Sequence, residues 1–280
     1  MLIRLFSALT LTWLALLPQS SSASDNRQAS RQDNAPETIQ PRLVVVIDDM
    51  GNDLAAGRAA LKLPGPVTYA FLPHLKHTID LADEALFRDK EVLLHAPMEN
   101  SRHLPLGPGG LSDSMPLDEV KARFAAALDA IPGVIGFNNH TGSLLTRLRP
   151  QMDAVMEVAK ARNMFFLDSV TATDTVAWQA ARDQGIPFMS RDVFLDHYQD
   201  TDFIDRQFRL ALDLARERGY AVVIGHPHPE TINYLRAALL TLAEDGFQQL
   251  SASAFLLQQQ ALGQEMGAPD PVAGPIYYPN

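Results

Sequence analysis

Leu43-Val44-Val45-Val46-Ile47-Asp48-Asp49-Met50-Gly51 is the stretch of sequence that decides the fold. Its first five residues form an uninterrupted apolar run, which is typical of a strand buried on both faces of a parallel sheet. The run ends at two adjacent carboxylates and a glycine. Parallel α/β sheets and barrels place their chemistry at the carboxyl ends of their strands, so this stretch predicts both a sheet and part of a site.

The acidic pair at the end of this run has two interpretations. Side chains alternate between the two faces of a strand, so Asp48 and Asp49 do not both point into the core. If the chain turns after Ile47, both carboxylates reach the same pocket. In the other interpretation, one aspartate caps the next helix and the other is solvated, although Asn52 and Asp53 are already suited to capping.

The composition is that of a globular protein with an acidic surface. The chain has 280 residues, of which 46% are hydrophobic and 20% charged, with a formal net charge of −10. This length fits one domain of α/β-barrel size or two smaller ones. There is no basic patch or arginine-rich run, so we expect no nucleic-acid partner. The absence of cysteine excludes disulfides and lipid attachment at a cleavage-site cysteine.

Residues 1–23 have the pattern of a signal peptide. Arg4 precedes an apolar run from Leu5 to Leu17, and the small residues Ser21-Ser22-Ala23 follow. The apolar run is shorter than the roughly 20 residues of a membrane span. We therefore expect export to a periplasm of the Gram-negative type and no membrane contact beyond this segment. An uncleaved N-terminal membrane anchor is the alternative.

The segments that flank the predicted domain are polar or rich in proline. Residues 24–40 have no apolar period, which predicts a disordered linker. Residues 263–280 contain four prolines and predict an extended tail. The folded domain is therefore expected at residues 41–262, and its oligomeric state is left open.

Strand-like and helix-like segments alternate within this domain. With the run at Leu43, eight short apolar runs predict strands, the other seven at residues 67–72, 91–94, 133–137, 164–167, 186–189, 221–224 and 247–250. Amphipathic faces lie between them, for example Ile204, Phe208, Ala211, Leu212 and Ala215, a face that Gly219 ends.

This alternation favours βαβ units and a parallel sheet. We expect a single-domain α/β fold, a complete or slightly irregular (β/α) barrel of about seven to eight parallel strands. An open doubly wound sheet is the alternative. It is less favoured, because no glycine-rich phosphate loop follows any strand.

Residues capable of chemistry follow most of the predicted strands. Five of the eight histidines come just after one: His74, His95, His140, His226 and His228. If the strands are parallel, these side chains share one rim with the acidic pair. Histidine and carboxylate ligands with a position open to water are typical of catalytic zinc sites, and other first-row divalent ions remain possible.

The joint pattern favours Asp49, His95 and His140 as metal ligands. We interpret His74 and His228 as hydrogen-bonded structural residues. The three other histidines are interpreted as surface or loop residues: His77, His103 and His197.

Several neighbouring residues are candidates for an outer shell. Glu99 lies four residues after His95, a spacing that brings two side chains onto one face in a helical turn, so it is a further ligand or an outer-shell partner. Arg191 and Asp192 form a buried ion pair or take a direct catalytic role. Asn139 and Asp168 complete the set.

Five short motifs stand at the predicted strand ends: Val46-Ile47-Asp48-Asp49-Met50-Gly51, Leu94-His95-Ala96-Pro97-Met98-Glu99, Asn138-Asn139-His140-Thr141-Gly142-Ser143, Arg191-Asp192-Val193-Phe194-Leu195-Asp196 and Ile224-Gly225-His226. Together they resemble the polysaccharide deacetylase superfamily, and specifically its divergent branch of exported bacterial proteins. The resemblance spans roughly Pro41 to Leu262. It implies a distorted (β/α) barrel and metal-dependent hydrolysis of an N-acetyl or O-acetyl group on a polysaccharide or peptidoglycan-like glycan.

The resemblance also implies roles for individual residues. Asp48 corresponds to a general base, Asp49 to a metal ligand and His226 to a general acid. Better-known members carry two ligand histidines four residues apart, where this chain has His95 and Glu99. They also have an Arg-Pro-Pro stretch on the next strand, which here delivers His140 instead. The expected metal set is therefore Asp49, His95 and His140, with zinc as the expected ion.

These departures keep other functions open. A non-catalytic glycan-binding or envelope-scaffold protein with a vestigial metal site is the main alternative, because the histidine pattern is altered and the arginine is missing. A metal-dependent phosphoesterase on the same barrel is less favoured, since the rim has few lysines or arginines to hold a phosphate.

Overall fold

The computed structural model describes residues 40–264 and 266–268. Its helices and strands run from Arg42 to Ala261. The expected signal peptide, almost all of the linker and the tail from residue 269 onward lie outside the described residues. Within the described part, no helix has the length and apolar character needed to cross a membrane.

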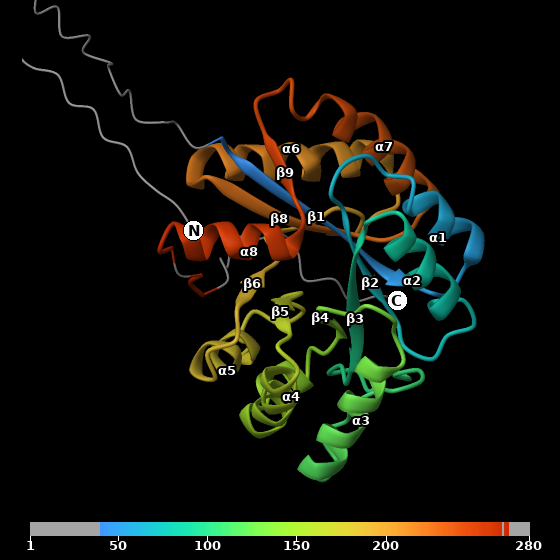
Figure 1. Cartoon of the computed structure of the whole chain (residues 1–280), viewed down its shortest axis with the longest axis vertical. Helices are drawn as coiled ribbons and strands as arrows, with labels where there is room; N and C mark the ends of the chain where they lie inside the picture. Colours follow the sequence, from blue (N-terminus) through green and yellow to red (C-terminus); the bar gives the residue numbers. More distant parts are fainter. Residues whose placement is uncertain (1–39, 265, 269–280) are drawn as a thin grey trace, which may run out of the picture. The chain divides into compact units, whose positions relative to one another are not determined.

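The strands of the described chain form one parallel sheet. Its order is β6-β5-β4-β3-β2-β1-β8-β7, with β9 paired to the start of β1. The strands are β1 (Arg42–Met50), β2 (Thr68–Phe71), β3 (Glu91–Met98), β4 (Gly136–Thr141), β5 (Phe165–Asp168), β6 (Phe188–Ser190), β7 (Val193–Phe194), β8 (Tyr220–Gly225) and β9 (Gln248–Leu250). The sheet curls into a half-barrel, so the predicted barrel is confirmed in a distorted form (Figure 1).

Helices connect and flank these strands (Figure 1). They are α1 (Leu54–Ala60), α2 (Thr78–Phe87), α3 (Leu117–Asp129), α4 (Arg149–Ala161), α5 (Ala177–Asp183), α6 (Thr201–Arg218), α7 (Pro229–Thr241) and α8 (Ala252–Ala261), with a 3-10 turn η1 (Leu145–Arg147). Gly219 ends α6 in the left-handed conformation, at φ 89°, as its position predicts. The strand β7 was not predicted, because two residues are too few to show a pattern.

Several strands run further toward the site than their apolar runs predict. β1 continues through the acidic pair to Met50, and β3 continues to Met98 rather than Leu94. β4 covers Gly136–Thr141, where residues 133–137 were predicted. The reason is that an apolar run marks only the part of a strand that is covered on both faces. Beyond that part, the backbone pairing continues while the side chains become polar.

Two apolar layers lie on the two sides of the sheet. Along β1, Leu43 and Val45 belong to the layer beneath the helices, whereas Val44 and Val46 belong to the barrel interior. Helix α8 closes the amino end of this interior with Phe255, which is fully buried. Backbone N–H groups at the start of α8 donate to side chains at the starts of β2 and β3, which fixes the helix there.

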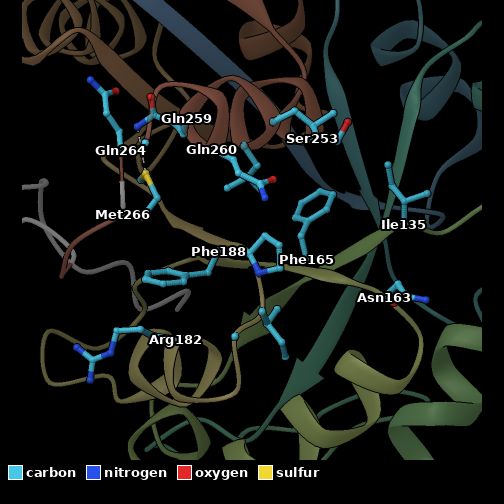
Figure 2. Close-up of a pocket in the computed structure, with 16 residues that line it drawn as sticks. Ile135, Asn163, Phe165, Arg182, Phe188, Ser253, Gln259, Gln260, Gln264 and Met266 are labelled. Atoms are coloured by element: carbon cyan, nitrogen blue, oxygen red, sulfur yellow. Dashed lines mark hydrogen bonds between the residues drawn. The ribbon is translucent and has the colours of Figure 1, made fainter.

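A cavity of about 660 Å³ opens beside α8, near the amino ends of β5 and β6 (Figure 2). Phe165, Phe188 and Leu256 form much of its wall. The described residues that line it include no histidine and no carboxylate.

Replacing Phe255 tests the role of α8 as the floor of the barrel. We expect Phe255→Ala to lower the free energy of unfolding by about 3–5 kcal/mol, because a fully buried ring is removed and leaves a void. Leu257→Ala is the matched control on the same helix. Its side chain is 66% exposed, so a change within about 0.5 kcal/mol is expected. Urea denaturation followed by circular dichroism measures both, and equal losses would contradict the prediction.

Candidate metal centre and active site

At the carboxyl end of the barrel, the strand positions that point inward are occupied by polar side chains. On β1, Asp48 follows Val44 and Val46 at two-residue intervals and is 2% exposed. The same alternation leads to His95 on β3, Asn138 and His140 on β4, Arg191 after β6 and His226 after β8. All of these except Asn138 line one cavity of about 360 Å³.

Asp49 joins this cavity through a backbone distortion. Its φ is 56°, in the left-handed region that non-glycine residues rarely adopt. The pairing of β1 with β2 also shifts register between Ile47 and Met50, as in a β-bulge, which re-aims a side chain. Both carboxylates therefore face the same cavity, as one of the two interpretations of the pair expects. Asp53 caps α1, so neither member of the pair serves as a cap.

Three potential ligand atoms converge in the cavity. Asp49 Oδ1 lies 3.0 Å from His140 Nδ1 and 3.2 Å from His95 Nε2, and the two imidazole nitrogens are 3.0 Å apart. Asp49 Oδ1 is buried and faces these two imidazole nitrogens. Ligand atoms that share a zinc-sized ion lie about 3.0–3.4 Å from one another, given bonds of about 2.0–2.1 Å. The donor set and its spacing therefore fit a divalent metal.

Asn138 organises the residues beside this triad, although it was not among the predicted site residues. Its Nδ2 donates to both oxygens of Asp48, at 2.8 and 3.0 Å. Its Oδ1 therefore accepts from His95 Nδ1, at 2.8 Å. This assignment leaves the lone pair of His95 on Nε2, the atom that faces Asp49 and His140. The Asn138 amide thus orients the Asp48 carboxylate and fixes the tautomer of His95.

The two adjacent carboxylates have opposite proton affinities. Burial raises the pKa of Asp48 and outweighs the lowering effects of His95 and His226. Burial also acts to raise the pKa of Asp49, but the nearby imidazoles of His140 and His95 hold it well below its ordinary value. Asp49 is thus the better anion and Asp48 the better proton acceptor.

His226 is held by a buried carboxylate, Asp196, that was also not among the predicted site residues. Its Nδ1 lies 2.9 Å from Asp196 Oδ1, and its backbone N–H donates to Asp196 Oδ2 at 2.6 Å. Its Nε2 faces the triad, 3.9 Å from Asp49 Oδ2. Burial lowers the pKa of His226, but the charge of Asp196 outweighs it and raises the pKa to about 10. Asp196 was overlooked because it follows the short strand β7.

Asp196 and His226 also belong to a second group of potential metal ligands. Asp196, His226 and His228 offer atoms within 4.8 Å of one another. Both oxygens of Asp196 are already committed, since Thr231 Oγ1 also donates to Oδ2 at 2.7 Å. We therefore interpret Asp196 as the residue that orients His226.

Glu99 does not join the metal triad. His95 lies within β3, so the helical turn that would bring the two side chains onto one face does not form. The Glu99 carboxylate instead accepts from Ser112 Oγ at 2.7 Å and from the Asp113 N–H at 2.9 Å, and lies 2.7 Å from His103 Nδ1. It fastens the long loop that forms one wall of the cavity.

Arg191 and Asp192, considered as an ion pair, have different partners. Asp192 contacts Arg218 and accepts from the Val222 N–H at 2.7 Å, on the outer side of the sheet. Arg191 has the inward position and lines the cavity. The two-residue alternation places them on different faces, while the charge of Asp192 still acts on Arg191 and opposes the lowering of its pKa by burial.

Asn139 and Asp168 fasten the loop after β5. Asn139 Oδ1 accepts from the Ser169 N–H at 2.9 Å, and Asp168 Oδ1 accepts from the Val170 N–H at 2.8 Å. Burial raises the pKa of Asp168 despite these hydrogen bonds. Asn139 also lines the cavity, whereas Asp168 supports its wall from behind.

The remaining histidines divide between the cavity and the outside. His228 lines the cavity, and its ring centroid lies 5.7 Å from that of His226. His197 also lines it, from the loop after β7, which agrees with its interpretation as a loop residue. His74 borders a separate hollow together with Thr78 and Asp129. The shared rim expected from the sequence therefore collects four of the five strand-end histidines.

Residues 45–256 match a family model described as divergent polysaccharide deacetylase. The chain belongs to this family. It is 36% identical over 219 residues to the uncharacterized protein YibQ of Escherichia coli (strain K12), a match that covers 78% of this chain and 68% of YibQ. It is 34% identical over 206 residues to an uncharacterized protein of Haemophilus influenzae, covering 74% of each. The resemblance inferred from the five motifs is confirmed.

Solved structures share the fold of this member of the divergent polysaccharide deacetylase family. An uncharacterized protein of Agrobacterium tumefaciens C58 has a TM-score of 0.75 at 21% identity, covering 78% of this chain and 90% of that one. A putative cellobiose-phosphate cleavage protein of Enterococcus faecalis V583 has a TM-score of 0.58 at 12% identity, covering 77% and 99%. A mutant of a CE4 family pseudoenzyme of Bacillus anthracis has a TM-score of 0.50 at 16% identity, covering 78% and 67%.

Removal of Asp49 tests the candidate metal centre. We expect Asp49→Ala to abolish zinc uptake, because it removes the anionic member of the triad. Elemental analysis of zinc-loaded, desalted protein measures this. Asp53→Ala, which removes the nearby capping carboxylate, should keep the metal. Zinc content unchanged in Asp49→Ala would refute the ligand set.

Glu99 gives the protein a stability that depends on pH. The hydrogen bond from Ser112 lowers the pKa of Glu99 to about 2, although burial opposes the shift. A depressed folded pKa stabilises the protein above the unfolded pKa, and this stabilisation is lost as the pH falls toward the folded value. The free energy of unfolding of wild type should therefore exceed that of Glu99→Gln by a constant amount above about pH 5, a difference that shrinks between about pH 4.5 and 2. Urea titrations across this range test it, and a difference independent of pH would contradict it.

Proposed function

We propose that this protein is a metal-dependent hydrolase that removes acetyl groups from an N- or O-acetylated cell-envelope polysaccharide. One observation carries the proposal. A three-atom ligand set, a buried carboxylate and a carboxylate-held histidine face the same cavity of about 360 Å³. Metal-dependent transfer of an acetyl group to water uses these three functions together: a Lewis acid, a general base and a general acid. Zinc is the proposed ion and the periplasm the proposed location.

Asp49, His95 and His140 are the residues that would hold the metal. A divalent ion bound there supplies a Lewis acid that polarises the acetyl carbonyl and lowers the pKa of a coordinated water. Asn138 prepares the site, because its amide oxygen keeps the proton of His95 on Nδ1 and leaves Nε2 free to bind.

Asp48 takes the proton of the attacking water. Its Oδ2 lies 3.7 Å from His95 Nε2, next to the ligand triad but outside it. Burial raises the pKa of its carboxyl, which makes it a better proton acceptor than a solvated aspartate. The two hydrogen bonds from Asn138 hold the carboxylate toward the water.

His226 protonates the nitrogen or oxygen that leaves with the sugar. Asp196 holds its Nδ1, so Nε2 is the atom presented to the cavity. The raised pKa, about 10, keeps the imidazole protonated before the reaction and ready to act as the acid.

The alternative function is that of a non-catalytic glycan-binding or envelope-scaffold protein with a vestigial metal site. Glu99 stands where better-known deacetylases have their second ligand histidine, and here it fastens a loop. The fold also occurs in a CE4 family pseudoenzyme, so the fold alone does not establish activity. Binding of an acetylated glycan without acetate release would favour this alternative.

Asp48→Asn separates catalysis from metal binding. We expect the variant to bind zinc like wild type but to release acetate roughly 10²–10⁴-fold more slowly, because the amide no longer accepts the proton of water. The assay follows acetate released from acetylated chitooligosaccharides or peptidoglycan by the zinc-loaded protein.

The adjacent Asp49→Ala variant is the matched comparison, since it should lose both metal and activity. Full acetate release by Asp48→Asn would remove the role of Asp48 as the base. A parallel assay with phosphorylated sugars separates deacetylation from phosphoester hydrolysis.

A further inference from the structure

Arg191 is a buried cation with a donor that the described fold does not use. Arg191 is 2% exposed, and its side chain lies on the same inward face as that of β6. Nε donates to the Ser169 carbonyl at 2.8 Å, and Nη2 donates to the Val170 carbonyl at 3.0 Å. Nη1 is also buried, and no described residue accepts a hydrogen bond from it. A buried N–H without an acceptor is costly, so this donor is expected to have a partner that binds from the cavity.

The loop that holds the guanidinium is strained. Val170 has φ 48°, a left-handed conformation that β-branched residues avoid. Asp168 and Asn139 fix this loop through the N–H groups of Val170 and Ser169. Strain of this kind persists where the geometry serves a function. Here it aligns two carbonyls against one guanidinium and leaves the third nitrogen of Arg191 available.

Arg191 lies near both proposed acid–base residues, because Phe194 contacts both it and His226, and its positive charge also acts on Asp48. Its Cζ lies 5.4 Å from the centre of the Phe194 ring, and that ring centre lies 5.1 Å from that of His226. All three residues line the cavity. In the proposed reaction, His226 protonates the atom that remains on the sugar. Phe194 therefore links Arg191 to the part of the cavity where the leaving atom of the sugar is protonated.

We propose that Arg191 Nη1 binds the sugar ring of the acetylated substrate by donating to the hydroxyl oxygen next to the acetylated position. A guanidinium only donates hydrogen bonds, so its partner must be an acceptor, and a neighbouring hydroxyl oxygen is the acceptor that a sugar offers there. The inference rests on the proposed function and extends it. Arg191 determines specificity for a sugar bearing a vicinal hydroxyl, whereas the triad, Asp48 and His226 act on the acetyl group.

Arg191→Lys tests this role with two substrates. Lysine keeps the positive charge but has no planar guanidinium group. It therefore cannot hydrogen-bond to the Ser169 and Val170 carbonyls and donate a third hydrogen bond into the cavity at the same time. With acetylated chitooligosaccharides, we expect kcat/KM to fall on the order of 10- to 100-fold, as for a lost hydrogen bond to a charged group. With 4-nitrophenyl acetate, which has the acetyl group but no sugar hydroxyl, kcat/KM should be little changed. Equal losses on both substrates would overturn the proposal.

Arg218→Lys is the matched control. It also replaces arginine with lysine, but beside the buried Asp192 on the outer side of the sheet. It should leave kcat/KM unchanged for both the chitooligosaccharide and 4-nitrophenyl acetate. Melting temperature and zinc content are measured for each variant. If Arg191→Lys does not fold, wild type is compared on an acetylated sugar and its deoxy analogue without the neighbouring hydroxyl. Equal kcat/KM for the two sugars would also overturn the proposal.

Binding without turnover distinguishes this inference from the proposed function. Calorimetry compares an N-acetylated chitooligosaccharide binding to zinc-loaded Asp48→Asn protein with and without Arg191→Lys. We expect Arg191→Lys to weaken binding on the order of tenfold or more. Equal affinities, or no binding to either protein, would reject the sugar contact. Arg191-dependent binding together with no acetate release by wild type would reject the proposed hydrolysis and keep the sugar site.

Discussion

The left-handed backbone of Asp49 is the constraint on which the rest of the site depends. Regular alternation along β1 would send one of two adjacent carboxylates into the barrel and the other beneath the helices. The φ of 56° and the register shift bring both into the cavity. Only in this arrangement does Asp49 Oδ1 meet His95 and His140 while Asp48 stays buried beside them. The opposite pKa shifts of the two acids are a consequence of this placement.

The inward alternation of the strands organises the remaining polar residues. At the carboxyl end of a strand, the last side chain that points into the barrel lines the cavity. The side chain beside it points to the other face of the sheet and hydrogen-bonds to backbone groups there. Arg191 and Asp192 show the difference, because one lines the cavity and the other contacts Arg218 outside it. Buried polar groups must be hydrogen-bonded, and Asn138 meets this requirement for a carboxylate and an imidazole with a single amide.

Much of this arrangement was predictable from the apolar runs and from the polar residues at their ends. The runs indicated the parallel sheet, and the polar residues gathered Asp49, His95 and His140 at one end of it. Glu99 was misjudged because a helical spacing was applied to a residue that follows a strand. Asn138 and Asp196 were overlooked because their roles depend on which face they occupy, and β7 is too short for its face to be recognised. The positive φ of Asp49 has no sequence signal, since aspartate adopts ordinary strand geometry far more often.

The floor made by α8 also governs how molecules move through the site. Phe255 and the fully buried apolar residues above it, among them Val46 and Ile224, fill the barrel below Asp48. The cavity is therefore a blind well with its mouth at the carboxyl end of the strands. A long polymer cannot be threaded down the barrel axis. In the proposed reaction, a polymer would lie across the mouth and lower one substituent at a time, and the released acetate would leave through the same opening.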